Sequence, residues 1–378
     1  MKKVVIVPDS FKGTLQSAEV CEIISERVKA HFPRCEILSF PVADGGEGST
    51  DCFLSALGGE KIYLTVKNPY MEDMTAYYGL INDGTAAVIE MASAAGLPLV
   101  EGRKDPLKTT TFGVGQMILD AAKRGCREII IGLGGSCTND CGAGAAAALG
   151  VRFINADGKE FVPTGGTLSS VARIDMSGMA KELKNIKIVS MCDIENPLYG
   201  EKGAAYVFAP QKGADENAVK YLDDGLRSFS DVIKRDVGKD VSKIAGGGAA
   251  GGMGAGMSAF FDSELKSGIS AVLDTIGFDE KIKGADVIFT GEGKLDAQSM
   301  GGKVVIGVSR RAEKQNVPVI AVVGGADENI SAVYGEGVTC VFTINRLPEP
   351  LEKSRFKSKE NLRETVDNIL RLIKIKNT

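Results

Sequence analysis

The feature that most constrains the fold of this chain is an apolar run that ends in paired glycines and continues into small polar residues. Ile129–Ile131 has the pattern of a buried strand, Gly134 and Gly135 follow it, and Ser136–Asp140 leads into an alanine-rich stretch that begins near Gly142. Glycine lets backbone N–H groups converge on an anion, and a helix N-terminus adds the positive end of its dipole. The pattern therefore predicts a strand, an anion-binding loop and a helix in succession.

The same succession recurs at two other places. The loop Asp44–Gly48 follows the apolar run Ile37–Phe40, and the loop Gly291–Asp296 follows Val287–Phe289. Both loops combine glycine with carboxylates. Glycine and carboxylate together at three strand ends suit Mg²⁺ and phosphate chemistry better than packing alone.

Length and patterning predict an α/β fold with two domains. The 378 residues exceed one ordinary core, and short apolar runs alternate with helical patterns, which is typical of mainly parallel sheets. We predict that residues 1–75 and 285–378 form one doubly wound domain, with residues 76–284 inserted as a second α/β domain with glycine-rich loops. Ligands are then expected in the cleft between the domains, at the carboxyl ends of strands.

Composition argues against several classes of function. The formal net charge of −4 argues against a nucleic-acid binder, and no apolar run approaches the roughly 20 residues that span a bilayer. The eight cysteines include no CxxC pair, so we expect reduced thiols and a cytoplasmic protein. The one histidine, His31, lies at the end of a predicted helix, which disfavours Ser-His-Asp hydrolysis and histidine-based zinc sites.

The common nucleotide motifs are missing. None of the four Gly-Lys pairs has the spacing of a Walker A loop, and the protein-kinase motifs are absent. The segment 142–147 matches G-x-G-x-x-A, but it begins well after the end of the preceding strand. Close helix packing explains that segment better than dinucleotide binding does.

Three further strand ends carry charged residues. Asp9 and Lys12 follow the first strand and suit an anionic substrate, although a capping Asp9 and a solvated Lys12 explain them equally well. Asp193 follows the expected strand at 186–189 and is a candidate base or metal ligand, with helix capping as the alternative. Lys212 follows an expected strand at 205–208, where it faces a phosphate or lies in a surface turn.

Taken together, these segments resemble the type I glycerate kinases, from Val4 to about Thr343. The matching stretches are Pro8–Gly13, Pro41–Gly48, Ile131–Ser136, Thr138–Asp140, Cys192–Leu198, Pro210–Ala214 and Thr290–Asp296. A small departure is that Cys137 and Cys141 stand where we expect Ala or Gly.

The resemblance implies ATP-dependent phosphorylation of D-glycerate with Mg²⁺, usually giving the 2-phosphate. It also implies a flavodoxin-like doubly wound domain from both chain ends and an inserted Rossmann-like α/β domain. The expected partners are therefore glycerate and a nucleotide, with no nucleic acid or membrane, and the sequence allows a homo-oligomer.

Phosphoryl transfer needs positioning, charge neutralisation and an oriented hydroxyl, and we assign residues to these tasks as hypotheses. The expected nucleotide-binding residues are Gly134, Gly135, Ser136, Thr138, Asn139, Lys212, Gly291 and Gly293. The expected substrate-binding residues are Asp9, Ser10, Asp44, Gly45 and Gly46. The expected Mg²⁺ ligands are Glu47, Asp140 and Glu292. The expected catalytic residues are Asp193 as proton acceptor, Lys12 and Lys303 as neutralising charges, and Asp296. Sequence alone does not settle which acid does which task.

Two other functions remain open at this point. One is a nicotinamide-dependent oxidoreductase acting on a hydroxy acid. The other is a non-catalytic protein that binds a small organic anion. ATP consumption that depends on D-glycerate separates all three functions.

Overall fold

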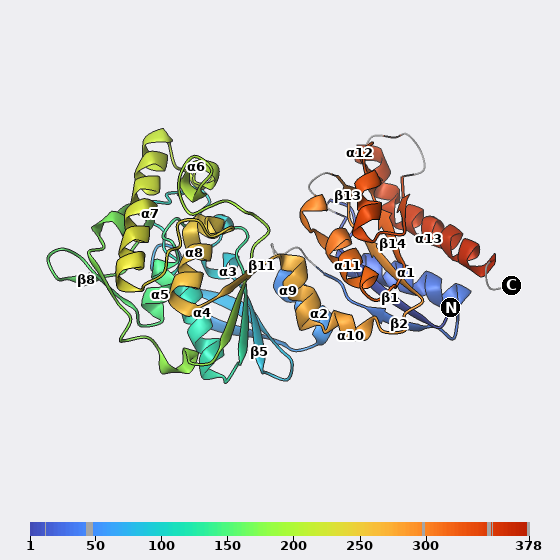
Figure 1. Ribbon diagram of the computed structural model, residues 1–378, viewed down its shortest axis with the longest axis horizontal. Coiled ribbons are helices and arrows are strands. Elements are labelled where there is room, and N and C mark those ends of the chain that lie inside the picture. The colour runs from blue at the N-terminus through green and yellow to red at the C-terminus, as the bar shows by residue number, and fades with distance from the viewer. Residues whose placement is uncertain (12, 43–47, 297–298, 346–348, 350, 376–378) are drawn as a thin grey trace. The chain divides into compact units, whose positions relative to one another are not determined.

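The computed structural model describes residues 1–11, 13–42, 48–296, 299–345, 349 and 351–375. It forms two compact units (Figure 1). The first unit comprises Met1–Asp44, Asp51–Leu57 and Ser267–Thr378, and the second comprises Gly45–Thr50 and Gly58–Lys266. In Figure 1 the blue N-terminal elements share one unit with the orange and red C-terminal ones.

The unit boundaries differ from the expected boundaries near residues 75 and 285. Strand β3 (Glu60–Lys67) pairs along its length with β4 (Asp73–Ile81) and so belongs to the sheet of the second unit. Helix α9 (Gly268–Thr275) packs against α11 (Val304–Glu313) and so belongs to the first unit. Residues 68–72 are therefore a turn inside one hairpin, and the expected boundary near residue 75 falls within β4.

The first unit is built on a parallel sheet with the order β16-β14-β12-β1-β2. Renumbered along the chain, this order is 2-1-3-4-5, which is the order of flavodoxin-like folds. Its strands are β1 (Lys3–Pro8), β2 (Glu36–Ser39), β12 (Val287–Gly291), β14 (Val319–Val323) and β16 (Cys340–Thr343). A short parallel pair, β13 (Lys294–Leu295) and β15 (Gly325–Ala326), lies beyond the ends of β12 and β14.

Helices cover both faces of this sheet because its buried strands are apolar on both sides. On one face, Ile6 and Phe289 pack with α1 (Ser17–His31) and α13 (Ser358–Ile375). On the other face, Ala321 and Val323 pack with α11. The remaining helices of this unit are α2 (Ser49–Leu57), mostly within it, α10 (Phe278–Lys281) and α12 (Leu351–Ser354). The doubly wound α/β prediction is confirmed.

His31 ends α1, as the sequence predicted. Its Nε2 lies 2.9 Å from Oδ1 of Asp367 on α13. The histidine therefore joins two packed helices and takes no part in a site.

The second unit contains a six-stranded mixed sheet with the order β11-β10-β6-β5-β4-β3. Strands β3, β4 and β5 are antiparallel neighbours, and β5, β6, β10 and β11 run parallel. The strands that complete it are β5 (Ala86–Glu90), β6 (Glu128–Gly132), β10 (Lys187–Met191) and β11 (Glu264–Lys266). The strand order is consecutive, so this sheet lacks the reversal at which a Rossmann sheet binds its dinucleotide.

Several helices and a small sheet complete the second unit. The helices are α3 (Ala92–Ala95), α4 (Phe112–Lys123), α5 (Ala143–Ala148), α6 (Ala204–Phe208), α7 (Glu216–Asp236) and α8 (Ala249–Phe261). The small sheet consists of β7 (Arg152–Ile154), β8 (Glu160–Phe161) and β9 (Arg173–Asp175). The expected strand at 205–208 is helical. The prediction was wrong because a short apolar run has no periodicity that distinguishes a strand from a helix.

Within the described ranges, no helix has the length and apolar character needed to cross a membrane. All eight cysteines are free thiols.

Candidate functional site

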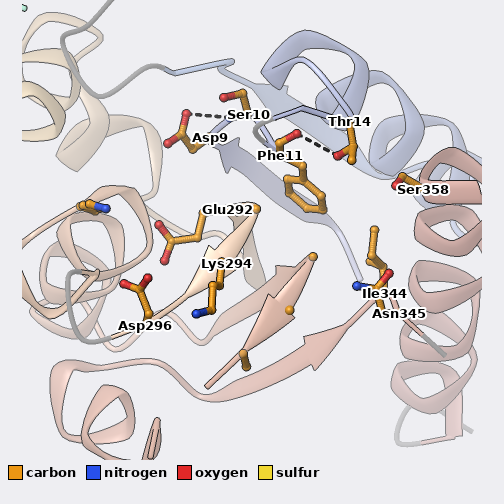
Figure 2. A pocket seen from close by; sticks show the side chains of 15 residues that line it. Asp9, Ser10, Phe11, Thr14, Glu292, Lys294, Asp296, Ile344, Asn345 and Ser358 are labelled. Carbon is orange, nitrogen blue, oxygen red and sulfur yellow. Dashed lines mark hydrogen bonds between the residues drawn. The ribbon is translucent and has the colours of Figure 1, made fainter. Parts of the chain in front are cut away.

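A cavity of about 480 Å³ lies at the carboxyl ends of the first unit's strands (Figure 2). Strands β1 and β12 are parallel neighbours, with Pro8 opposite Gly291. From β1 the chain moves to β2 on one side, and from β12 it moves to β14 on the other. The loops after β1 and β12 therefore diverge, and open α/β sheets bind ligands at such a point.

Three carboxylates line this cavity, from the loops that follow β1 and β12. They belong to Asp9, Glu292 and Asp296, and Figure 2 shows them on one side of the cavity. Asp9 is 6% exposed and accepts the N–H of Ser10 on Oδ1 at 2.6 Å. Asp296 accepts the N–H of Ser299 on Oδ1 at 3.3 Å. The expected residues Asp9, Ser10, Glu292 and Asp296 are thus brought together.

Glu292 is the most deeply buried of these acids. It is 4% exposed, and its Oε1 has no hydrogen-bond partner within the described part of the chain. Burial raises the pKa of Glu292 to about 7, and the carboxylates of Asp9 and Asp296 act in the same direction. A hydrogen bond from Ser299 and the charge of Lys303 lower that pKa.

Two lysines border the cavity in different ways. Lys303 is half-buried and caps the N-terminus of α11. Lys294 is exposed and forms an ion pair with Asp327 at 2.7 Å. Lys303 is therefore the lysine that acts on the buried acid.

The glycines at and just after the end of β12 are involved in contacts between strands. A Cβ on Gly291 would lie 2.1 Å from the carbonyl oxygen of Val322 on β14, so only glycine allows the two strands to approach. The carbonyl of Gly293 accepts the N–H of Gly325 at 3.1 Å. The contact with Val322 thus explains why position 291 requires glycine, with no need to invoke a bound nucleotide. Gly293 lines the cavity through its backbone.

The loop after β6 in the second unit has an exposed tip and a buried base. Gly134 and Gly135 are exposed, and Gly135 has a φ of 73°, which favours glycine. The carbonyl of Gly135 accepts the N–H of Leu97 at 2.9 Å, and Ser136 pairs with Gly96. The tip is therefore held in place while its N–H groups remain near the surface.

Lys212 lies beneath this loop. It is 2% exposed, and its Nζ donates to Oγ of Ser136 at 2.8 Å and to the carbonyl oxygen of Thr138 at 2.7 Å. Burial lowers the pKa of Lys212 to about 8. The alternative of a surface turn is therefore wrong for this lysine.

Asn139 follows directly and is fully buried. Neither its Oδ1 nor its Nδ2 has a hydrogen-bond partner within the described residues, and the same holds for Oγ1 of Thr138. Buried polar groups are nearly always paired, so these atoms mark a place for a polar ligand or water.

Asp140 has a different role from the one expected. It is fully buried, and its carboxylate accepts the N–H of Thr111 at 2.7 Å, the Thr111 hydroxyl at 2.8 Å, and the N–H groups of Gly142 and Gly144. Burial raises the pKa of Asp140 against these hydrogen bonds. The N-terminus of α5, where we expected a phosphate, is thus occupied by the protein's own carboxylate, which leaves Asp140 poorly placed to bind a metal ion.

Comparisons with known proteins agree with this picture. A sequence profile of the glycerate kinase family matches residues 4–374. The chain is 47% identical to a glycerate kinase of Bacillus cereus, over 99% of this chain and 98% of the relative. The chain belongs to the glycerate kinase family.

Other members of the family agree over nearly the same length. Glycerate 2-kinase of Escherichia coli K12 is 41% identical over 90% of each chain. A crystal structure of a protein assigned as glycerate kinase 2 from Salmonella typhimurium LT2 is 40% identical and has a TM-score of 0.89, covering 100% of this chain and 99% of that one. The α/β fold is therefore shared along the whole chain.

Several expected site residues of this family member lie outside the described residues. They are Lys12, Asp44, Gly45, Gly46 and Glu47. Of the other expected metal ligands, Asp140 lies in the second unit and Glu292 in the first. In the part of the chain that the structure describes, no three His, Cys, Asp or Glu side chains are grouped to hold a metal ion.

Asp193 belongs to a different unit from the acids that line the cavity. It follows β10 in the second unit and its side chain is exposed. An exposed carboxylate lacks the desolvation that makes an acid an effective base near neutral pH. Glu292 has that environment, and its sequence position alone did not reveal it.

Sequence reasoning missed two buried partners. Glu90, at the end of β5, accepts the N–H of Thr50 at 2.7 Å and that of Gly48 at 3.3 Å. Thr111 holds Asp140 from 29 positions upstream. The sequence did carry a signal for Glu90, because this residue is another carboxylate at the end of an apolar run. No nearby residue in the sequence connects Thr111 with Asp140.

Proposed function

We propose that this protein is a glycerate kinase that transfers the γ-phosphoryl group of ATP to the 2-hydroxyl of D-glycerate. The observation that carries the proposal is the family match along residues 4–374. The 2-position is supported by the E. coli relative, which is named a glycerate 2-kinase.

The cavity of the first unit is the proposed glycerate site. A small polar molecule suits its volume, and Lys303 supplies a positive charge for the substrate carboxylate. Asp9 and Asp296 supply acceptors for the hydroxyl groups. This arrangement binds a hydroxy acid through both its carboxylate and its hydroxyl groups.

The loop after β6 is the proposed phosphate site. The exposed backbone of Gly134 and Gly135 offers N–H donors, and the ammonium of Lys212 holds the loop from beneath. The unpartnered amide of Asn139 gives the site an additional donor and acceptor. These residues match the expected nucleotide set in the second unit.

Mg²⁺ is proposed to enter with ATP. The described carboxylates form no three-ligand group, which does not fit a dedicated protein cage. Mg²⁺ commonly relies on substrate phosphates and water with only one or two carboxylates.

We also propose a cytoplasmic location, which the eight free thiols support because such thiols persist in reducing compartments.

A coupled assay tests the proposal. We expect ADP formation that requires D-glycerate, with a product that enolase consumes directly because it is the 2-phosphate. A product that first needs phosphoglycerate mutase contradicts the 2-position. Glycerate-dependent reduction of a nicotinamide, or glycerate binding without any ATP turnover, contradicts the kinase itself.

A further inference from the structure

Glu292 combines two properties that a structural carboxylate does not need. It is almost fully buried, yet its Oε1 has no hydrogen-bond partner among the described residues. Leaving a buried acceptor unpaired destabilises the folded state, and more so for a charged group. Such a cost persists at functional sites, where a ligand supplies the missing donor.

Glu292 lines the cavity, so a ligand bound there lies beside its side chain. The side chain borders the cavity at the point where the loops after β1 and β12 diverge (Figure 2). The other two acids each have one carboxylate oxygen engaged by a backbone N–H, on Ser10 for Asp9 and on Ser299 for Asp296. Oε1 of Glu292 is thus well placed to receive a hydroxyl group.

Charged groups around Glu292 come from several segments at this edge of the sheet. Asp9 approaches from β1, Asp296 from the loop after β13, and Lys303 from the start of α11. Ser299 adds a hydrogen bond, and Lys294 is paired with Asp327. The positive charge of Lys303 therefore offsets the negative charges of the three carboxylates at this edge.

From this geometry we infer that Glu292 is the catalytic base that accepts the proton of the attacking glycerate hydroxyl. The inference rests on the proposed glycerate kinase function. The hydroxyl oxygen forms a bond to the γ-phosphorus as the bond from that phosphorus to the β,γ-bridging oxygen breaks. ADP leaves with the bonding electrons, and the hydroxyl proton passes to Oε1 of Glu292 and then to solvent.

The decisive test compares Glu292→Gln with wild type at saturating ATP and D-glycerate. Gln keeps the shape and cannot accept the proton, so we expect kcat to fall by about 10²–10⁴-fold, the usual contribution of a general base. Glycerate affinity from calorimetry is expected to change by less than the fall in kcat. The matched control is Glu280→Gln, which changes an exposed glutamate on α10 that pairs with Lys283, and it should behave as wild type.

The conservative variant Glu292→Asp adds a readout that a merely structural role would not give. Asp keeps the carboxylate but shortens the side chain, so kcat should lie between the values for wild type and Glu292→Gln. This second variant keeps the test valid if Glu292→Gln folds poorly.

Three outcomes would overturn the inference. The first is a Glu292→Gln enzyme that retains kcat while Asp193→Asn loses it. The second is a Glu292→Gln enzyme whose kcat is recovered by high Mg²⁺, which makes Glu292 a metal ligand. The third is a Glu292→Asp enzyme that is no more active than Glu292→Gln. If wild type itself shows no glycerate-dependent ATP turnover, the proposed function fails, and this result is distinct from the other three.

Discussion

The ammonium of Lys212 lies 2.7 Å from the carbonyl oxygen of Thr138 and donates a hydrogen bond to it. A second bond of 2.8 Å reaches the hydroxyl of Ser136. One buried lysine, distant in sequence, thus holds both ends of a short segment in the loop after β6. A positive charge kept beneath a glycine loop also favours an anion above it.

Replacing Lys212 by Met should destabilise the protein in a pH-dependent way. Thr138 and Ser136 lose their donor, at a cost of about 1–3 kcal/mol at pH 7. Burial lowers the pKa of Lys212 from 10.5 to about 8, so the folded state binds fewer protons than the unfolded state between these pH values. Wild type should therefore gain stability relative to the variant as pH rises from about 8 to 10.5.

Chemical denaturation of wild type and Lys212→Met across pH 7–10.5 measures this difference. Titrations elsewhere in the protein cancel because both proteins share them. Parallel profiles over the whole range would show that the ammonium is not buried in solution.

Asn139→Leu should separate stability from ligand binding. Leucine has a similar volume and no polar atoms, and the amide it replaces has no partner among the described residues. We expect the melting temperature of the ligand-free protein to stay the same or rise. The increase in melting temperature that ATP gives wild type by mass action should be lost or strongly reduced.

Thermal melts with and without millimolar Mg-ATP give both readouts from one experiment. An unchanged nucleotide shift in Asn139→Leu would mean that ordered water, and not ligand, pairs with this amide. A large loss of ligand-free stability would point to the same conclusion.

Asp140→Asn should lower the stability of the ligand-free protein, in contrast to Asn139→Leu. The carboxylate accepts hydrogen bonds from Thr111, Gly142 and Gly144, and an amide nitrogen cannot accept them. We expect a loss of about 2 kcal/mol or more, seen as a lower denaturation midpoint. A stable variant that instead needs more Mg²⁺ for activity would restore the metal-ligand hypothesis for Asp140.

The parts of the fold that depend on local pattern could be predicted from the sequence. Apolar runs located β1, β6 and β12, and the carboxylates at strand ends singled out Asp9 and Glu292, which both line the cavity. Parallel strands bring their carboxyl ends to one edge, so these loops of the first unit had to meet.

The parts that could not be predicted depend on contacts between distant residues. Gly291 has the pattern of a phosphate contact, but its lack of a side chain is explained by Val322 on the neighbouring strand. Asp140 has the pattern of a metal ligand, but the hydroxyl and N–H of Thr111 occupy its carboxylate. The short run at 205–208 has no period that distinguishes helix from strand, and its neighbours made it a helix.

Glu292→Gln should stabilise the folded protein at alkaline pH even as it removes activity. Burial raises the pKa of Glu292 from 4.5 to about 7, so the folded state holds a proton that the unfolded state has released between these pH values. The contribution of Glu292 to stability therefore falls as pH rises from about 4.5 to 7, and the full cost is present above pH 7. Gln carries no charge and escapes that cost, which amounts to at most about 3 kcal/mol.

Denaturation midpoints for the two proteins at pH 5 and pH 8 measure this effect. We expect similar stabilities at pH 5 and a more stable variant at pH 8. The control is again Glu280→Gln, whose exposed carboxylate pairs with Lys283 at the surface and should give no such difference between the two pH values. A variant that is less stable at both pH values would show that the carboxylate of Glu292 is needed by the fold, and that its unpartnered oxygen is paired in solution.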